Sequence, residues 1–138
     1  MQNPRMDIVD GFISRTLDKS LWTHDAHQIT AIWFLMHYEP DDALCRIKSG
    51  IIAYNLAVGG ENTGQNGYHE TITILWWSLI HLFVERHREF SYEDLCDAFL
   101  SSPYSARDIG FKFYTKERLL SSEARSRYLT PDIQEITL

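Results

Sequence analysis

Three of the six histidines, His24, His27 and His69, lie where helices are expected to begin, and this placement is the most selective chemical feature of the sequence. His24 and His27 are three residues apart, so a helix would bring both rings onto one face. His69 is followed by Glu70 at the start of another expected helix. If the two helix N-termini lie at the same end of the molecule, three imidazoles and a carboxylate gather in one small volume.

One interpretation of this set is a metal centre. Three imidazole nitrogens and one carboxylate match the ligands of zinc, or of a non-haem iron or manganese ion, with a position left for water or substrate. The expected divalent metal ligands are then His24, His27, His69 and Glu70. Two observations weigh against this interpretation: an H-x-x-H spacing is common, and the positive end of a helix dipole opposes a cation.

A second interpretation uses the same residues without a metal. Helix N-termini present free N–H groups that favour a carboxylate or phosphate, and their field keeps nearby histidines neutral. The expected catalytic residues are His24, His69, Glu70 and Tyr54, with a histidine as general base. Both interpretations predict a small enzyme acting on a small polar or anionic metabolite. The alternative is a non-catalytic protein that binds a small ligand or another protein through its helices, in which the histidines are incidental.

Two further side chains are expected to bind the substrate. Trp22 immediately precedes the capped turn that bears His24, so its ring is suited to form a wall of the site. Arg118 is suited to hold a substrate carboxylate through two hydrogen bonds. Arg118 and Arg125 are seven residues apart, and they share a helix face if that helix is continuous.

The segment 59–67, with the sequence GGENTGQNG, is the one long loop that the sequence predicts. Tyr54 and Asn55 precede it near the end of a helix, from which both side chains can donate hydrogen bonds into a site; Asn55 is therefore a third expected substrate-binding residue. Because this flexible segment directly precedes His69, it occupies the place where a lid is expected.

The elements that must position these residues are all helices. Caps, first-turn prolines and apolar residues at helical spacing predict helices over residues 4–17, 24–38, 40–58, 69–88, 91–101, 103–110 and 115–128. The alternation typical of strands is nowhere sustained. We therefore expect an all-α, single-domain bundle of five to seven helices spanning 1–138, with the apolar helix 69–88 at its centre.

Composition excludes several classes of partner. The 138 residues carry 19 acidic and 13 basic side chains, a net charge of -6, and no run of Lys or Arg. Nucleic acid and an anionic membrane are therefore not expected partners. The most apolar stretch, 71–84, is shorter than the roughly 20 residues of a membrane-spanning helix. The expected partner is a small molecule, and an oligomer remains open.

The cysteines indicate a reducing compartment. Cys45 and Cys96 are far apart in the sequence, form no C-x-x-C pair and follow no secretory leader. We therefore expect a cytoplasmic protein.

Several short motifs resemble a family of small bacterial helical proteins of unassigned function. The resemblance covers about residues 20 to 133 and rests on a W-T-H-x-x-H motif over 22–27, a G-Y-H-E-T motif over 67–71, the pair Tyr54-Asn55, the segment 122–125 and Pro131-Asp132. It implies a bacterial, all-helical protein in which these positions recur together. It implies no reaction.

Overall fold

The structure, a computed structural model that describes residues 3–138, is built from helices whose first turns are capped as the sequence predicts. The Thr23 hydroxyl accepts a hydrogen bond from the backbone N–H of Ala26 at 3.2 Å, and the Ser91 hydroxyl accepts one from Asp94 at 3.1 Å. Pro4 begins its helix, where a missing N–H breaks no helical bond.

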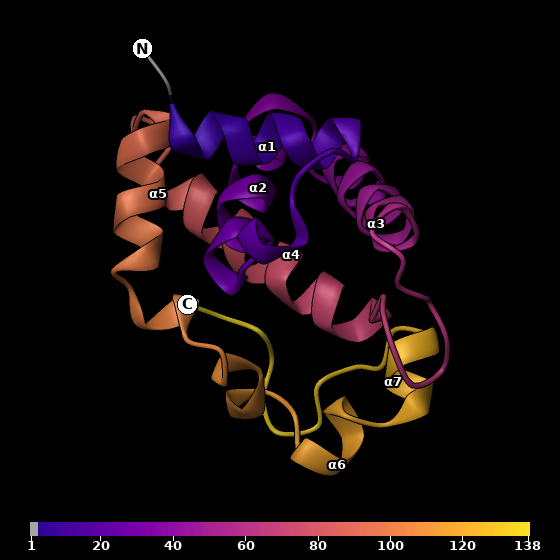
Figure 1. Cartoon of the computed structure of the whole chain (residues 1–138). Helices are drawn as coiled ribbons and strands as arrows, with labels where there is room; N and C mark the ends of the chain where they lie inside the picture. Colours follow the sequence, from indigo (N-terminus) through magenta and orange to yellow (C-terminus); the bar gives the residue numbers. More distant parts are fainter. Residues whose placement is uncertain (1–2) are drawn as a thin grey trace.

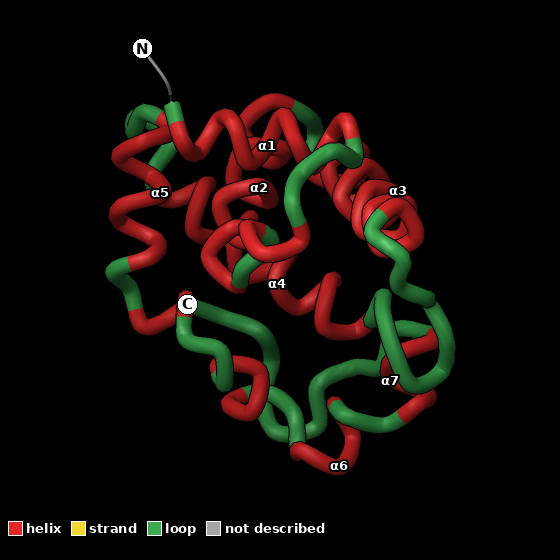
Figure 2. Tube along the Cα trace, viewed as in Figure 1, coloured by secondary structure: helices red, strands yellow, loops and turns green. Residues whose placement is uncertain are grey.

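Within residues 3–138 there are seven α-helices, three short 3-10 helices and no strand, so the predicted all-α class is confirmed (Figures 1 and 2). The α-helices are α1 (Pro4–Ser14), α2 (His24–His37), α3 (Pro40–Ala57), α4 (Glu70–Arg86), α5 (Tyr92–Leu100), α6 (Lys116–Leu119) and α7 (Ser122–Ser126). The 3-10 helices are η1 (Lys19–Leu21), η2 (Pro103–Ser105) and η3 (Ile109–Lys112).

The first helix ends earlier than predicted. Residues 15–17 do not continue α1, because Arg15 adopts a left-handed conformation with φ 62° and donates its N–H back to the last turn. The chain then folds over Gly11, where a side chain would meet Leu17 at 2.9 Å. The absence of a side chain at Gly11 therefore lets Leu17 pack against the helix that it leaves.

The pair α2 and α4 forms the centre of the bundle. α2 packs against α1, α3, α4 and α5, and α4 packs against α2, α3 and α7 (Figure 1). Leu75, Leu79 and Ile80 of α4 are fully buried. Ile72, Trp76 and Trp77 of the same helix are only partly buried, because they line a cavity between α2, α3 and α4.

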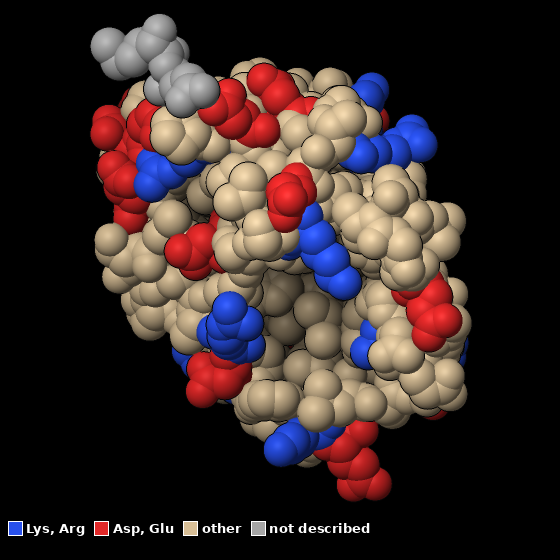
Figure 3. All heavy atoms as spheres, viewed as in Figure 1, with Lys and Arg blue, Asp and Glu red and all other residues tan. Residues whose placement is uncertain are grey.

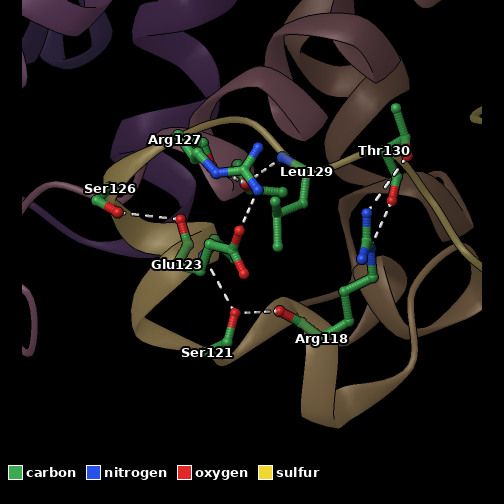
Figure 4. Close-up of polar contacts among 9 residues, drawn as sticks. Arg118, Ser121, Glu123, Ser126, Arg127, Leu129 and Thr130 are labelled. Atoms are coloured by element: carbon green, nitrogen blue, oxygen red, sulfur yellow. Dashed lines mark hydrogen bonds and ion pairs between the residues drawn. The ribbon is translucent and has the colours of Figure 1, made fainter.

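The C-terminal third contains less helix than predicted. The helix expected over 103–110 is replaced by η2 and η3, and the helix expected over 115–128 is divided into α6 and α7. The division follows from Ser121, whose hydroxyl caps α7 by accepting from the Ala124 N–H at 3.0 Å and also donates to the Arg118 carbonyl (Figure 4). Arg118 and Arg125 therefore do not share one helix face.

The chain after α7 is fastened to α4 by buried hydrogen bonds. The Thr71 hydroxyl donates to the Arg127 carbonyl at 2.9 Å and accepts from the Leu129 N–H at 3.1 Å. The Tyr114 hydroxyl donates to the Leu129 carbonyl at 2.7 Å. In the described part of the chain, no helix has both the length and the apolar character required to span a membrane.

Candidate functional site

His69 is a structural residue whose two ring nitrogens are both engaged. Nδ1 accepts a hydrogen bond from the backbone N–H of Ile72 at 3.1 Å, which caps α4. Nε2 lies 3.0 Å from the Leu119 carbonyl, and since a carbonyl only accepts, Nε2 carries the proton. Burial and the nearby charge of Arg125 lower the pKa of His69. The ring therefore links α4 to α6 as a neutral cap, with no nitrogen left for a metal or a substrate.

Glu70 is held in an ion pair at the start of α4. Its carboxylate lies 2.6 Å from Lys48 Nζ and accepts a hydrogen bond from the Tyr68 hydroxyl at 2.6 Å. Burial of the carboxylate opposes ionisation, but these two contacts outweigh it and lower the pKa of Glu70. Glu70 is thus an ionised carboxylate whose oxygens already have partners.

Tyr54 and Asn55 also serve the fold. The Tyr54 ring is buried and its hydroxyl donates to the Leu17 carbonyl at 2.8 Å. Asn55 donates to Asn62 Oδ1 at 3.0 Å, and Asn62 Oδ1 also accepts from the backbone N–H of Tyr68. Asn62 therefore ties the segment 59–67 to α3, and none of that segment lines the cavity described below.

Arg118 holds the C-terminal segment rather than a ligand. Its Nε donates to the Thr130 carbonyl at 2.7 Å, and the close-up in Figure 4 shows the guanidinium turned toward Thr130. Glu123 and Arg127 form an ion pair on α7 beside it. The expected role of Arg118 in binding a carboxylate finds no support in this arrangement.

The four expected metal ligands do not come together. Among residues 3–138, no group of three or more His, Cys, Asp or Glu side chains is placed to hold a metal ion. The physical reason is that His69 and Glu70 are bound to Leu119 and Lys48, whereas His24 and His27 line a cavity that neither His69 nor Glu70 lines. The predicted single site of His24, His27, His69 and Glu70 is therefore corrected to a cavity that contains only the first two.

This cavity lies between α2, α3 and α4 and has a volume of about 430 Å³. Figure 3 shows the face hollowed near its centre, below the η1–α2 segment of Figure 1, with Lys and Arg side chains around the hollow. The volume falls in the range of about 300–1,000 Å³ typical of small-molecule sites. The lining side chains are mostly aromatic and aliphatic, with a few polar groups: Phe12, Trp22, Thr23, His24, His27, Gln28, Thr30, Ala31, Ile47, Ile51, Ile72, Thr73, Trp76, Trp77, Ile80 and Arg107.

His27 presents a free nitrogen in this cavity. Its Nδ1 lies 2.7 Å from the Thr23 carbonyl and must donate to it, so Nε2 of the neutral ring is an unprotonated acceptor. The ring lies against Trp22, with the two centroids 4.0 Å apart. Desolvation, together with the positive charge of Arg107, lowers the pKa of His27, although the bond to Thr23 opposes this shift. His27 is therefore neutral at pH 7.

His24 and Gln28 fasten the η2 segment over the cavity. His24 Nε2 lies 2.8 Å and Gln28 Nε2 lies 3.0 Å from the Ser105 carbonyl. Because both nitrogens donate to this one oxygen, the 3.0 Å approach between them is not itself a hydrogen bond. Ser105 is thereby held two residues before Arg107, which is exposed.

Three buried polar atoms in the described part of the chain lack a hydrogen-bond partner, and all three belong to residues that line this cavity. They are Trp22 Nε1, Gln28 Oε1 and Thr30 Oγ1. Gln28 and Thr30 are each only 2% exposed. A buried polar group without a partner costs about 1–3 kcal/mol, so native proteins rarely leave several together. The three atoms are themselves covered by neighbouring protein atoms, so they are unpaired polar groups in the wall of the cavity.

The sequence contains a pattern on one helix that indicates this cavity, although the metal hypothesis did not use it. His24, His27, Gln28 and Ala31 follow the spacing of one helix face, and Gln28 and Thr30 are polar residues within an otherwise apolar helix. Trp22 was expected to form a wall of the site, and it does line the cavity. Arg107, Trp76 and Trp77 gave no local signal, because only the packing of α4 and η2 against α2 brings them there.

No protein-family model, curated protein or solved structure matches this chain.

Proposed function

We propose that this protein binds a small, largely apolar and planar organic anion in the cavity between α2, α3 and α4. The observation that carries this proposal is the cavity itself, which has a volume of about 430 Å³, mainly aromatic and aliphatic walls, and Arg107 and His27 among its few polar lining residues. Water alone is a poor occupant, because the walls are mainly aromatic and aliphatic and offer few hydrogen bonds. An organic molecule with an apolar body fits these walls better.

The charge of the ligand follows from the arginine that lines the cavity. Arg107 is exposed at the mouth and, within residues 3–138, forms no ion pair. A carboxylate, phosphate or sulfate is the group that this guanidinium binds best. The N-terminus of α2 beside it adds a favourable field.

Catalysis in the same cavity is the second candidate, and His27 is the observation in its favour. The neutral imidazole with a free Nε2 is the lining group best suited to take a proton from a bound molecule. This replaces the earlier expectation of His69, Glu70 and Tyr54, whose polar atoms already have partners in the fold, and of His24, whose Nε2 is bound to the Ser105 carbonyl.

Binding is tested by calorimetric titration with 2-naphthoate and with its uncharged counterpart 2-naphthalenemethanol. We expect saturable one-to-one binding of 2-naphthoate, weakened about two- to fivefold in Arg107→Gln because an exposed ion pair is lost. The uncharged compound should bind the wild type and Arg107→Gln equally. Arg86→Gln, an exposed arginine outside the cavity, is the matched control and should change neither affinity.

Blocking the cavity provides the second arm. Ala31 lines the cavity and is 7% exposed, so Ala31→Leu places three more carbons in the space that the ligand needs. We expect this variant to keep its helical circular dichroism and to lose 2-naphthoate binding. Ala57→Leu, at the exposed end of α3, should bind as the wild type does. Undiminished binding in folded Ala31→Leu would refute the proposed place of binding.

A further inference from the structure

The ring of His27 is fixed so that its nitrogen can only accept a hydrogen bond. The donation from Nδ1 to the Thr23 carbonyl at 2.7 Å selects the tautomer, and the contact with Trp22, with the centroids 4.0 Å apart, holds the plane of the ring. In the part of the chain that the structure describes, Nε2 has no hydrogen-bond partner, and His27 is an exposed residue that lines the cavity. A fixed, unpaired acceptor beside a cavity selects a ligand that carries a donor.

The surroundings of His27 keep it in this accepting state. The charged or titratable groups near the ring are His24 on its own helix and Arg107 from the segment after η2. The neighbouring wall residues of α3 and α4, which include Ile47, Ile51 and Trp76, carry no charge. Within residues 3–138, no carboxylate lines the cavity to stabilise an imidazolium, and the positive charge of Arg107 disfavours one.

Arg107 and His27 both line the cavity, and both are exposed. The charge of Arg107 is close enough to act on the His27 ring. The mouth of the cavity thus offers a cation and a neutral acceptor side by side. A ligand that satisfies both has an anion and a donor on neighbouring parts of its framework.

We infer that the ligand is a hydroxylated aromatic acid, or its N–H equivalent, whose anion pairs with Arg107 and whose donor binds Nε2 of His27. This inference rests on the proposed function and narrows it to a class of ligand. An ether at the position of the hydroxyl has no proton to donate, so His27 discriminates against it.

The test compares three compounds that share one body: 2-naphthoate, 4-hydroxy-2-naphthoate and 4-methoxy-2-naphthoate. In calorimetric titrations at pH 7.5 we expect the hydroxylated compound to bind about three- to tenfold more tightly than 2-naphthoate, as expected for one added hydrogen bond. The methoxy compound should bind no more tightly than 2-naphthoate.

Two variants assign the effect to His27. His27→Phe keeps an aromatic ring against Trp22 but has no acceptor, so the three affinities should become equal. His27→Gln offers a carbonyl oxygen and should restore part of the preference for the hydroxyl. Thermal melts of both variants establish that they fold.

The outcomes separate this inference from the proposed function. If all three compounds bind the wild type equally and Ala31→Leu abolishes binding, the cavity is a ligand site and the role of His27 is refuted. If the preference for the hydroxyl persists in His27→Phe, the role of His27 is refuted as well. If none of the compounds binds, both proposals fail.

Discussion

The unpaired hydroxyl of Thr30 leads to a prediction with an unusual sign. Thr30 and Thr71 are buried threonines on helices, 2% and 0% exposed. The Thr71 hydroxyl donates to Arg127 and accepts from Leu129, whereas the Thr30 hydroxyl has no partner among the residues that the structure describes. Replacing each by valine keeps the β-branched shape and removes only the hydroxyl.

The expected magnitudes follow from these contacts. An unpaired buried hydroxyl costs about 1–3 kcal/mol, so Thr30→Val should raise the free energy of unfolding by about 1 kcal/mol. Thr71→Val loses two hydrogen bonds of about 1 kcal/mol each, so it should lower the free energy of unfolding by about 2 kcal/mol. The same substitution at two buried positions thus differs by about 3 kcal/mol.

Urea unfolding followed by circular dichroism measures both values. In thermal melts, the midpoint temperature should rise by about 4 °C in Thr30→Val and fall by about 8 °C in Thr71→Val. If Thr30→Val destabilises the protein as much as Thr71→Val does, the Thr30 hydroxyl has a firm partner in the free protein. The argument from unpaired atoms around the cavity would then be wrong.

Three further predictions concern His69, His27 and the segment 59–67. His69→Ala should lower the free energy of unfolding by about 2 kcal/mol, because it removes the cap of α4 and the hydrogen bond to Leu119. Urea titration measures this loss, and an unchanged free energy of unfolding would contradict the capping role. The pKa values of His27 and His69 are lowered in the folded protein, so the unfolded chain binds more protons than the folded protein just below pH 6.5. The free energy of unfolding should therefore fall as the pH drops from 7.5 to 5. A smaller slope is expected in His27→Phe, and a slope equal to that of the wild type would count against the lowered pKa of His27. Asn62→Ala removes the hydrogen bonds that hold segment 59–67, so limited proteolysis should cut this segment faster than in the wild type. Asn66→Ala serves as the control, because it loses only an exposed contact to Glu61.

The sequence predicted the helices because their ends are set locally. The cap at Thr23, the proline at 40 and the cap at Ser91 act within one turn, and helices α2 to α5 begin and end within two residues of the predicted limits. The last predicted helix was wrong because Ser121 offered a second cap in the middle of a helical pattern. One long helix and two short helices both fit the local spacing of apolar residues. The packing of the C-terminal segment selects the two short helices.

The histidines show why the site was harder to predict. His69 is the N-cap of α4 and His24 is the first residue of α2, yet the ring of His69 binds the Leu119 carbonyl and the ring of His24 binds the Ser105 carbonyl. These two carbonyl partners are distant from the histidines in the sequence, so no local pattern predicts the contacts. The apolar circumference of α4 predicted a helix at the centre of the bundle, but it did not reveal that Ile72, Trp76 and Trp77 form a cavity wall.

The most direct test of the cavity as a ligand site is a ¹H–¹⁵N spectrum of the four indole N–H groups during titration with 2-naphthoate. Trp22, Trp76 and Trp77 line the cavity, Trp33 does not, and Trp22 Nε1 is the unpaired donor. We predict that the Trp22 signal shifts most and saturates, that the Trp76 signal follows it, and that the Trp33 signal stays in place. A Trp22 signal that does not move at saturating concentrations of 2-naphthoate, or four signals that move together, would contradict binding in this cavity.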